Sequence, residues 1–237
     1  MKKHLILTLI LTLALCVCGT AFAQESYNIT FTDGPSHHDK GTTWSADIVL
    51  PNVSGMADAE EQQALNDYFQ QALDATVASY EEDVAYVNEN YPDGNGPHFS
   101  CDVNYEVVTD SDDYIVLKVW MFYAAGDSAT FNQYWVFSKH TGKEVPMTDV
   151  ITAEIFTAAK EQIRAEMEKA NEESEAMYWV DDESLDTAMD NLDAARHWYI
   201  NNDGDLVIVF DKYEIAPGAQ GESEFVIAAA AAAASAE

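Results

Sequence analysis

The apolar positions between residues 60 and 90 recur at intervals of three and four, which is the spacing of one face of an α-helix. These positions are Leu65, Phe69, Leu73, Val77, Tyr80, Val84 and Val87. Asp58 precedes the run as a candidate N-cap, with Glu61 three residues later, and a cluster of breakers begins at Pro92. The spacing therefore predicts one long amphipathic helix that ends before Pro92.

Shorter apolar runs on both sides of this segment predict strands. Residues 27–31 and 44–50 form two such runs before the helix, and a polar stretch that contains "PSHHDKG" separates them as an expected loop. After the helix, apolar residues take alternate positions from 101 to 107, then dominate residues 114–123 and 131–137. Turn residues separate these three later runs, so we expect an antiparallel meander.

The second half of the chain combines helical spacing with a hairpin signal. A helix is predicted from about residue 152, a shorter one follows near residues 185–192, and "HWYI" and "LVIVF" are joined by an Asp-Gly turn. Strands and helices come in blocks instead of alternating. The expected fold class is α+β, with antiparallel sheet or sheets packed with one long N-terminal amphipathic helix and one or two later helices.

The first 23 residues have the pattern of a secretory signal peptide. An apolar run follows two lysines, and Ala21-Phe22-Ala23 provides the small residues that signal peptidase prefers. The run is shorter than the about 20 residues that cross a bilayer as a helix, so the mature chain from Gln24 is expected to have no membrane span. Lipidation at Cys16 or Cys18 is an alternative, although neither cysteine follows a small residue.

Charge limits the choice of partners. The sequence has 42 acidic and 11 basic residues and a net charge of -31. Such a surface repels phosphate, which excludes nucleic acid and disfavours bare anionic lipid. Two interpretations remain open: the charge provides solubility and salt tolerance, or it steers a cationic partner, whose association would then slow as salt rises.

Candidate catalytic and metal-binding groups are few. Neither Gly-x-Ser-x-Gly nor His-Glu-x-x-His occurs in the sequence. His37, His38 and Asp39 form its one cluster of histidine and carboxylate, which we interpret as a solvated turn instead of a metal site. The stretch 201–205 fails as a calcium loop because Phe210 stands where an acid is needed. We expect no enzymatic activity, no cofactor and no metal.

Single polar residues inside the predicted elements have structural interpretations. After cleavage of the leader Cys101 is the one remaining cysteine, and its place on the apolar side of a strand predicts a buried structural thiol. The isolated histidines His98, His140 and His197 are interpreted as surface or packing residues. The acidic clusters at 110–113 and 181–183 are expected by chance in this composition, although they have the residue type of glycosidase acids.

Two stretches resemble the RsiV-like extracellular domain family, a domain of unknown function. "YWVFSKHTGKEVPMTDVI" is similar to the strand, Thr-Gly-Lys turn and helix start of that family, and "WYINNDGDLVIVFDKYEIAPGAQGESEFVI" is similar to its closing hairpin and Tyr-Glu-Ile-Ala-Pro bend. The upstream part resembles, at the level of fold, the companion domain found in RsiV and in peptidoglycan deacetylases. We therefore predict a signal peptide at 1-23, an N-terminal part at 24-125, an RsiV-like C-terminal domain at 126-227 and an alanine-rich tail at 228-237.

The resemblance implies an ectodomain that binds lysozyme, a strongly basic protein. Two departures are expected to matter: no cytoplasmic anti-sigma segment or lasting anchor is anticipated, and residues 124–127 replace the Gly-Gly-Ala-His loop of relatives. The expected function is a secreted, non-enzymatic binding protein of the bacterial cell envelope, with a cationic protein such as lysozyme as ligand. The alternatives are a peptidoglycan-binding accessory to cell-wall enzymes and an envelope protein without a specific ligand.

The bend between the last two predicted strands is the candidate contact surface. Its residues Tyr213, Glu214 and Pro217 lie at the expected edge of the domain and are predicted to face a partner. The alternative is a bend that serves only the fold, in which Tyr213 and Ile215 pack inward.

Overall fold

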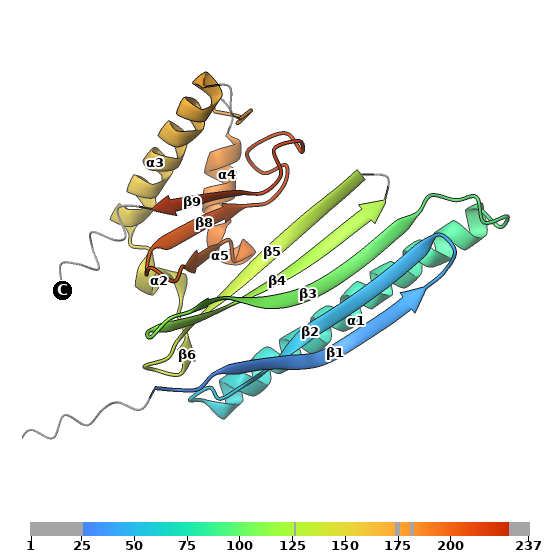
Figure 1. Ribbon diagram of the computed structural model, residues 1–237, viewed down its shortest axis with the longest axis horizontal. Helices are drawn as coiled ribbons and strands as arrows, with labels where there is room; N and C mark the ends of the chain where they lie inside the picture. Colours follow the sequence, from blue (N-terminus) through green and yellow to red (C-terminus); the bar gives the residue numbers. More distant parts are fainter. Residues whose placement is uncertain (1–25, 126, 174–175, 181–182, 228–237) are drawn as a thin grey trace, which may run out of the picture.

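The computed structural model describes residues 26–125, 127–173, 176–180 and 183–227. The predicted signal peptide, the two leader cysteines and the alanine-rich tail lie outside the described residues, and so does part of the acidic cluster at 181–183. The fold class is α+β, with a six-stranded mixed sheet, a three-stranded antiparallel sheet and helices packed beside each of them (Figure 1).

The larger sheet has the strand order β1-β2-β3-β4-β5-β6. Its strands are β1 (Thr30–Lys40), β2 (Trp44–Ser54), β3 (Phe99–Asp110), β4 (Tyr114–Ala125), β5 (Asp127–Ser138) and β6 (Lys143–Glu144). The three central strands form the expected antiparallel meander. However, β2 and β3 pair in parallel, so the prediction of purely antiparallel sheet is wrong at this pair. Parallel pairing requires a long crossover, and α1 (Ala59–Asn90) supplies it.

Helix α1 lies on one face of the larger sheet, alongside β1 and β2 (Figure 1). The Asp58 carboxylate caps it by accepting hydrogen bonds from the backbone N–H groups of Glu60 and Glu61, at 2.8 and 3.2 Å. The buried helix residues are Leu65, Phe69, Leu73, Tyr80 and Val87. Together with apolar residues of β2 to β5 they form the first hydrophobic core.

The polar stretch predicted as a loop before the helix is largely part of β1, so that prediction is wrong. The ladder between β1 and β2 shifts register between Asp33 and Ser36, which accommodates Gly34 and Pro35 in a bulge. Pro51 faces Asp33 at this irregularity, and β2 continues beyond it to Ser54. Because β1 is an edge strand, its polar side chains keep their contact with water, and the alternation that marks a half-buried strand is missing.

The C-terminal half builds a second core. Its elements are α2 (Met147–Val150), α3 (Ala153–Glu172), α4 (Ser184–Asp190), α5 (Leu192–Ala195), β7 (Trp198–Ile200), β8 (Leu206–Phe210) and β9 (Ser223–Ile227). Strands β7, β8 and β9 form the antiparallel three-stranded sheet, and β7 and β8 make the expected hairpin. Val116, Tyr134 and Val136 of the larger sheet belong to this second core.

Strands β4 and β5 therefore connect the two halves of the molecule. The larger sheet takes strands from both sides of residue 126, and the domain division there stays a prediction. The face of β4 and β5 turned away from α1 contributes to the second core at Val116, Tyr134 and Val136. Farther along the same face, Trp120 and Phe122 are partly exposed and belong to neither core formed by the described residues. Among the described residues, no helix has the length and apolar character needed to cross a bilayer.

Candidate functional site

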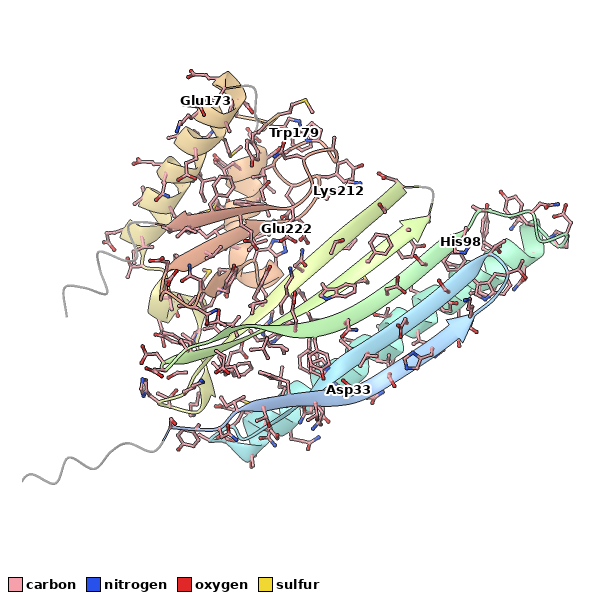
Figure 2. The ribbon with its side chains drawn as sticks, viewed as in Figure 1. Asp33, His98, Glu173, Trp179, Lys212 and Glu222 are labelled. Atoms are coloured by element: carbon pink, nitrogen blue, oxygen red, sulfur yellow. The ribbon has the colours of Figure 1, made fainter. Side chains whose placement is uncertain are left out.

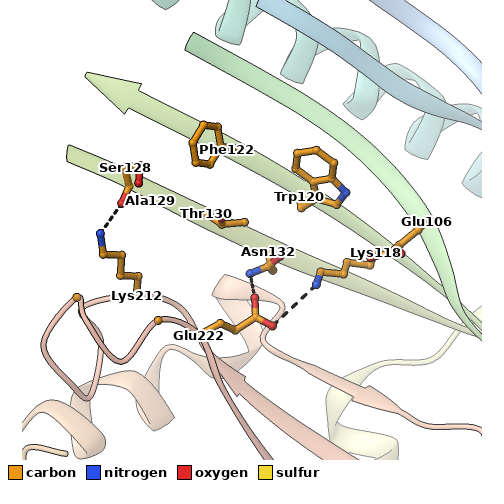
Figure 3. A pocket seen from close by; sticks show the side chains of 12 residues that line it. Glu106, Lys118, Trp120, Phe122, Ser128, Ala129, Thr130, Asn132, Lys212 and Glu222 are labelled. Carbon is orange, nitrogen blue, oxygen red and sulfur yellow. Dashed lines mark hydrogen bonds and ion pairs between the residues drawn. The ribbon is translucent and has the colours of Figure 1, made fainter. Parts of the chain in front are cut away.

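The segment between β8 and β9, residues 211–222, lies beside β5 and encloses a cleft with the larger sheet. Figure 2 places Lys212 and Glu222 on this segment, toward β4 and β5. The cleft has a volume of about 440 Å³. Its lining includes Glu106, Lys118, Trp120, Phe122, Asn132 and Glu222 (Figure 3). Strands and a long loop that are distant in the sequence thus meet in one concave surface.

Side chains of this segment take the place of a neighbouring strand along part of the edge of β5. The backbone N–H of Asn132 donates to both carboxylate oxygens of Asp211, at 3.2 and 3.1 Å. The Lys212 ammonium donates to the carbonyl oxygen of Ser128. Backbone groups that an edge strand leaves unpaired are therefore satisfied by a carboxylate and an ammonium group.

A buried ion cluster fixes the start of the segment. His197 is 6% exposed, with Nε2 3.4 Å from Oδ2 of Asp211 and Nδ1 3.2 Å from Oε2 of Glu214. Burial opposes the charged imidazole, but the hydrogen bonds to Asp211 and Glu214 outweigh it and raise the pKa of His197 to about 9. The imidazolium present at neutral pH therefore compensates the buried carboxylate of Asp211 and the partly exposed carboxylate of Glu214.

Sequence reasoning did not identify this role of His197. The histidine precedes β7, whereas both of its carboxylate partners follow β8. They come together only because β7 and β8 form a hairpin against β5, and no short-range spacing marks such an arrangement. The nearest sequence signal was the histidine itself, beside an expected strand.

Asn132 joins the ion cluster to the cleft. Its side-chain N–H groups donate to Asp211 at 2.7 Å and to the carboxylate of Glu222. Its Oδ1 has no hydrogen-bond partner among the described residues, although the residue is only 1% exposed. Glu222 also lies 3.9 Å from the ammonium of Lys118. Burial raises the pKa of Glu222, and Lys118 opposes this rise.

The predicted contact residue Tyr213 points outward. Its side chain is 49% exposed and its backbone has a positive φ of 75°, so the alternative interpretation, in which Tyr213 packs inward, is wrong. The hydroxyl donates to Asp127, and the ammonium of Lys212 lies 4.8 Å from the ring centroid. Hydrogen bonds from Tyr213, Ser128 and Lys212 lower the pKa of Asp127 to about 2. The ring is thus exposed yet held in place.

The other residues of the bend divide between surface and interior. Ile215 is 1% exposed and lies in the second core, as the inward-packing alternative expected for this residue. Glu214 accepts a hydrogen bond from the backbone of Asp211 at 2.7 Å in addition to its contact with His197, and Pro217 is partly buried. The structure brings the three predicted site residues together in one segment, and their role in binding stays a prediction.

The histidine cluster of the N-terminal region lies in β1 and not in a turn, so its interpretation as a solvated turn is wrong. Nδ1 of His38 lies 2.7 Å from Asp47, and Asp39 accepts a hydrogen bond from the Tyr80 hydroxyl at 3.0 Å. Within the part of the chain that the structure describes, no three His, Cys, Asp or Glu side chains are arranged to hold a metal ion.

The prediction that the Cys101 thiol is buried is confirmed, since the residue is 3% exposed. Burial, together with the nearby carboxylates of Asp102 and Asp83, raises the pKa of Cys101 to about 11. The thiol is therefore protonated at neutral pH, as expected for a structural cysteine.

Comparison with known proteins identifies a family for part of the C-terminal half. Residues 148–229 match the family model described as "Protein of unknown function (DUF3298)". The anti-sigma-V factor RsiV of Bacillus subtilis is 27% identical over 204 residues, which cover 84% of this chain and 67% of RsiV. The chain contains an RsiV-like DUF3298 domain. This confirms the resemblance drawn from the two sequence stretches.

One solved structure shows that the similarity of fold extends beyond the matched residues. The crystal structure of a DUF3298 family member from Bacteroides fragilis covers 86% of this chain and 91% of its own, with a TM-score of 0.54 and 12% identity. A DUF3298 family protein from Pseudomonas aeruginosa PAO1 has the same two coverages, a TM-score of 0.48 and 16% identity.

The match also shows how the cleft is assembled. His197 and the whole 211–222 segment fall inside the residues matched to DUF3298, whereas Trp120, Phe122 and Asn132 precede them. The DUF3298 domain therefore supplies one wall of the cleft, and strands upstream of it supply the other.

Proposed function

We propose that this protein is a secreted, non-enzymatic binding protein of the bacterial cell envelope whose ligand is a cationic protein such as lysozyme. The similarity to RsiV over 84% of the chain carries the proposal. The resemblance to RsiV-like extracellular domains points to lysozyme as the kind of ligand, and the predicted signal peptide points to export.

The distribution of charge supports a cationic ligand. Helix α1 contains no lysine or arginine in its 32 residues. Its acidic residues are Glu60, Glu61, Asp67, Asp74, Glu81, Glu82, Asp83 and Glu89. A helix of one charge sign on a protein of net charge -31 attracts a basic protein at long range and accelerates encounter at low salt.

The 211–222 segment is the proposed contact surface. Tyr213 offers an exposed aromatic ring, and Tyr and Trp are the residue types that most often dominate the binding energy of interfaces. The ring is held by Asp127 and by the ion cluster below Glu214, so little conformational freedom is lost when a partner covers it. Tyr213, Glu214 and Pro217 are therefore our proposed contact residues.

Calorimetric titration of the purified protein with lysozyme tests the proposal. We expect a complex at low ionic strength whose affinity falls as salt rises, because surface charges are screened. Tyr213→Ala should weaken it, whereas Tyr86→Ala, which removes a 60% exposed tyrosine from α1, should not. Absence of heat and of a co-eluting complex at low ionic strength would refute lysozyme as the ligand.

A second candidate function is binding of peptidoglycan as an accessory to cell-wall enzymes. The specific observation in its favour is the pair of partly exposed rings, Trp120 and Phe122, with the amides of Asn104 and Asn132 directly across from Trp120 on the neighbouring strands. Aromatic faces with adjacent amides suit the stacking and hydrogen bonding of sugar rings. Co-sedimentation of the protein with insoluble peptidoglycan, together with absence of lysozyme binding in the titration, would favour this function.

A further inference from the structure

We propose that the cleft between the 211–222 segment and strands β3 to β5 receives an arginine side chain of the partner, with its guanidinium stacked on Trp120. This inference rests on the proposed function, because it names the chemistry by which the same site recognises a cationic protein.

The cleft has an aromatic floor. Trp120 and Phe122 lie on β4, on the face turned away from α1, and both are partly exposed (Figure 3). Asn104 and Asn132 pair with Trp120 from the two neighbouring strands, and Thr130 pairs with Phe122 from β5. The indole is thus framed by small polar side chains that leave space above the strands.

The carboxylate of Glu106 borders this floor on the side of β3. Asp102 and Glu106 stand two positions to either side of Asn104, which makes them the diagonal neighbours of Trp120 on the same face. Asp102 also lies directly opposite Asp47 of β2, a like-charge pair. Burial and the charge of Asp47 raise the pKa of Asp102, but Asp102 lines a neighbouring hollow beside β2, so Glu106 is the β3 carboxylate that lines the cleft itself.

The cations of the cleft are already paired. Lys118 lies beside Glu222 and 5.7 Å from the ring centroid of Tyr134. Lys212 is 3.1 Å from Asp127 and also donates to a backbone carbonyl. Among the described residues that line the cleft, the exposed carboxylate of Glu106 and the rings of Trp120 and Phe122 remain for a ligand. These remaining groups favour a cation with several hydrogen-bond donors over an anion.

Arginine matches the carboxylate and the aromatic rings of the cleft better than lysine. A guanidinium is planar and always charged, so it stacks on an indole face while its N–H groups reach carboxylate or amide oxygens at the rim. An ammonium is more strongly hydrated and has no flat face to place on the ring. The cleft volume of about 440 Å³ leaves room for one such side chain.

Titration of the purified protein with hexa-arginine and hexa-lysine peptides, in parallel with lysozyme, tests the inference. We expect hexa-arginine to bind more tightly than hexa-lysine. Trp120→Ala should weaken hexa-arginine binding by about five- to thirtyfold, corresponding to the loss of one cation–π contact. Trp120→Phe should weaken it less, and Tyr86→Ala, which removes an exposed ring among the acids of α1, should leave it unchanged.

Circular dichroism of each variant shows whether it is folded. If Trp120→Ala does not fold, Trp120→Phe and Glu106→Gln carry the test, with an expected loss of up to about fivefold for removal of one exposed charge. Equal affinity of wild type and folded Trp120 variants for hexa-arginine would overturn the inference. Trp120-dependent binding of neutral chitohexaose, without binding of hexa-arginine, would overturn it in favour of a glycan.

The lysozyme titration separates failure of this inference from failure of the proposed function. If lysozyme binds wild type and Trp120→Ala equally, and hexa-arginine binding is also insensitive, the arginine site is refuted while lysozyme binding stands. If lysozyme does not bind but hexa-arginine binds in a Trp120-dependent manner, the proposed ligand is wrong and the arginine site is supported.

Discussion

The buried ion cluster predicts a specific dependence of stability on pH. In the folded protein the pKa of His197 is about 9, compared with 6.5 for an ordinary histidine. One pKa unit corresponds to about 1.4 kcal/mol, so protonated His197 stabilises the fold by about 3 kcal/mol. Because the folded pKa is the raised one, this contribution is fully present below pH 6.5 and is lost as pH rises through 9.

Urea unfolding of wild type and His197→Gln, repeated from about pH 6 to 10, measures this contribution. The variant should be less stable by about 3 kcal/mol or more at pH 6, because Asp211 also loses its buried partner. The difference between the two proteins should shrink as pH rises from about 6.5 and reach its smallest value near pH 9. Ionisation of Cys101 and of the buried tyrosines affects both proteins alike and cancels in this difference.

His98→Gln provides the matched control, since His98 is exposed and the substitution should change neither stability nor its pH dependence. A difference between wild type and His197→Gln that stays constant between about pH 6 and 10 would refute the reasoning, because His197 would then be neutral in the folded protein.

Three further outcomes follow from single contacts. Asp58→Ala should lower stability by about 1 kcal/mol in thermal denaturation and Asp58→Ser should restore most of it; equal stability of all three would contradict the cap. Cys101 should resist a thiol reagent near pH 8 until urea is added, and equal rates in both conditions would contradict its burial. Gly218→Ala would place a Cβ 2.3 Å from Cζ of Tyr213 and so displace the ring, which should reduce lysozyme binding as Tyr213→Ala does. Unchanged binding would show that the affinity does not depend on the position of this ring.

Local spacing predicted the elements whose faces differ in polarity. The alternation from 101 to 107 and the apolar runs at 114–123 and 131–137 lie within β3, β4 and β5, because each of these strands buries at least one face. Strand β1 has no such pattern, since it lies at the sheet edge with exposed side chains. Its pairing with β2 depends on hydrogen bonds between backbone groups, and the pattern of side chains does not predict these.

Long-range arrangement could not be predicted in the same way. The parallel pairing of Trp44 with Phe99 depends on the path of the intervening helix, and no residue in either strand encodes a direction. The outward orientation of Tyr213 accompanies a positive φ, which residues other than glycine seldom adopt, so the sequence left the outward and the inward orientation of the ring both open. The bend was identified as a candidate surface, but its ion cluster required the folded hairpin.

The contacts of Asp211 and Lys212 that cover the edge of β5 form late in the synthesis of the chain. The chain emerges from the ribosome N-terminus first, so β5 is complete long before Asp211 and Lys212 exist. During that interval the backbone N–H of Asn132 and the carbonyl of Ser128 lack their native partners and can pair with another extended chain. Translation that stops short of residue 211 should therefore yield a product that self-associates through this edge, whereas the finished chain protects it.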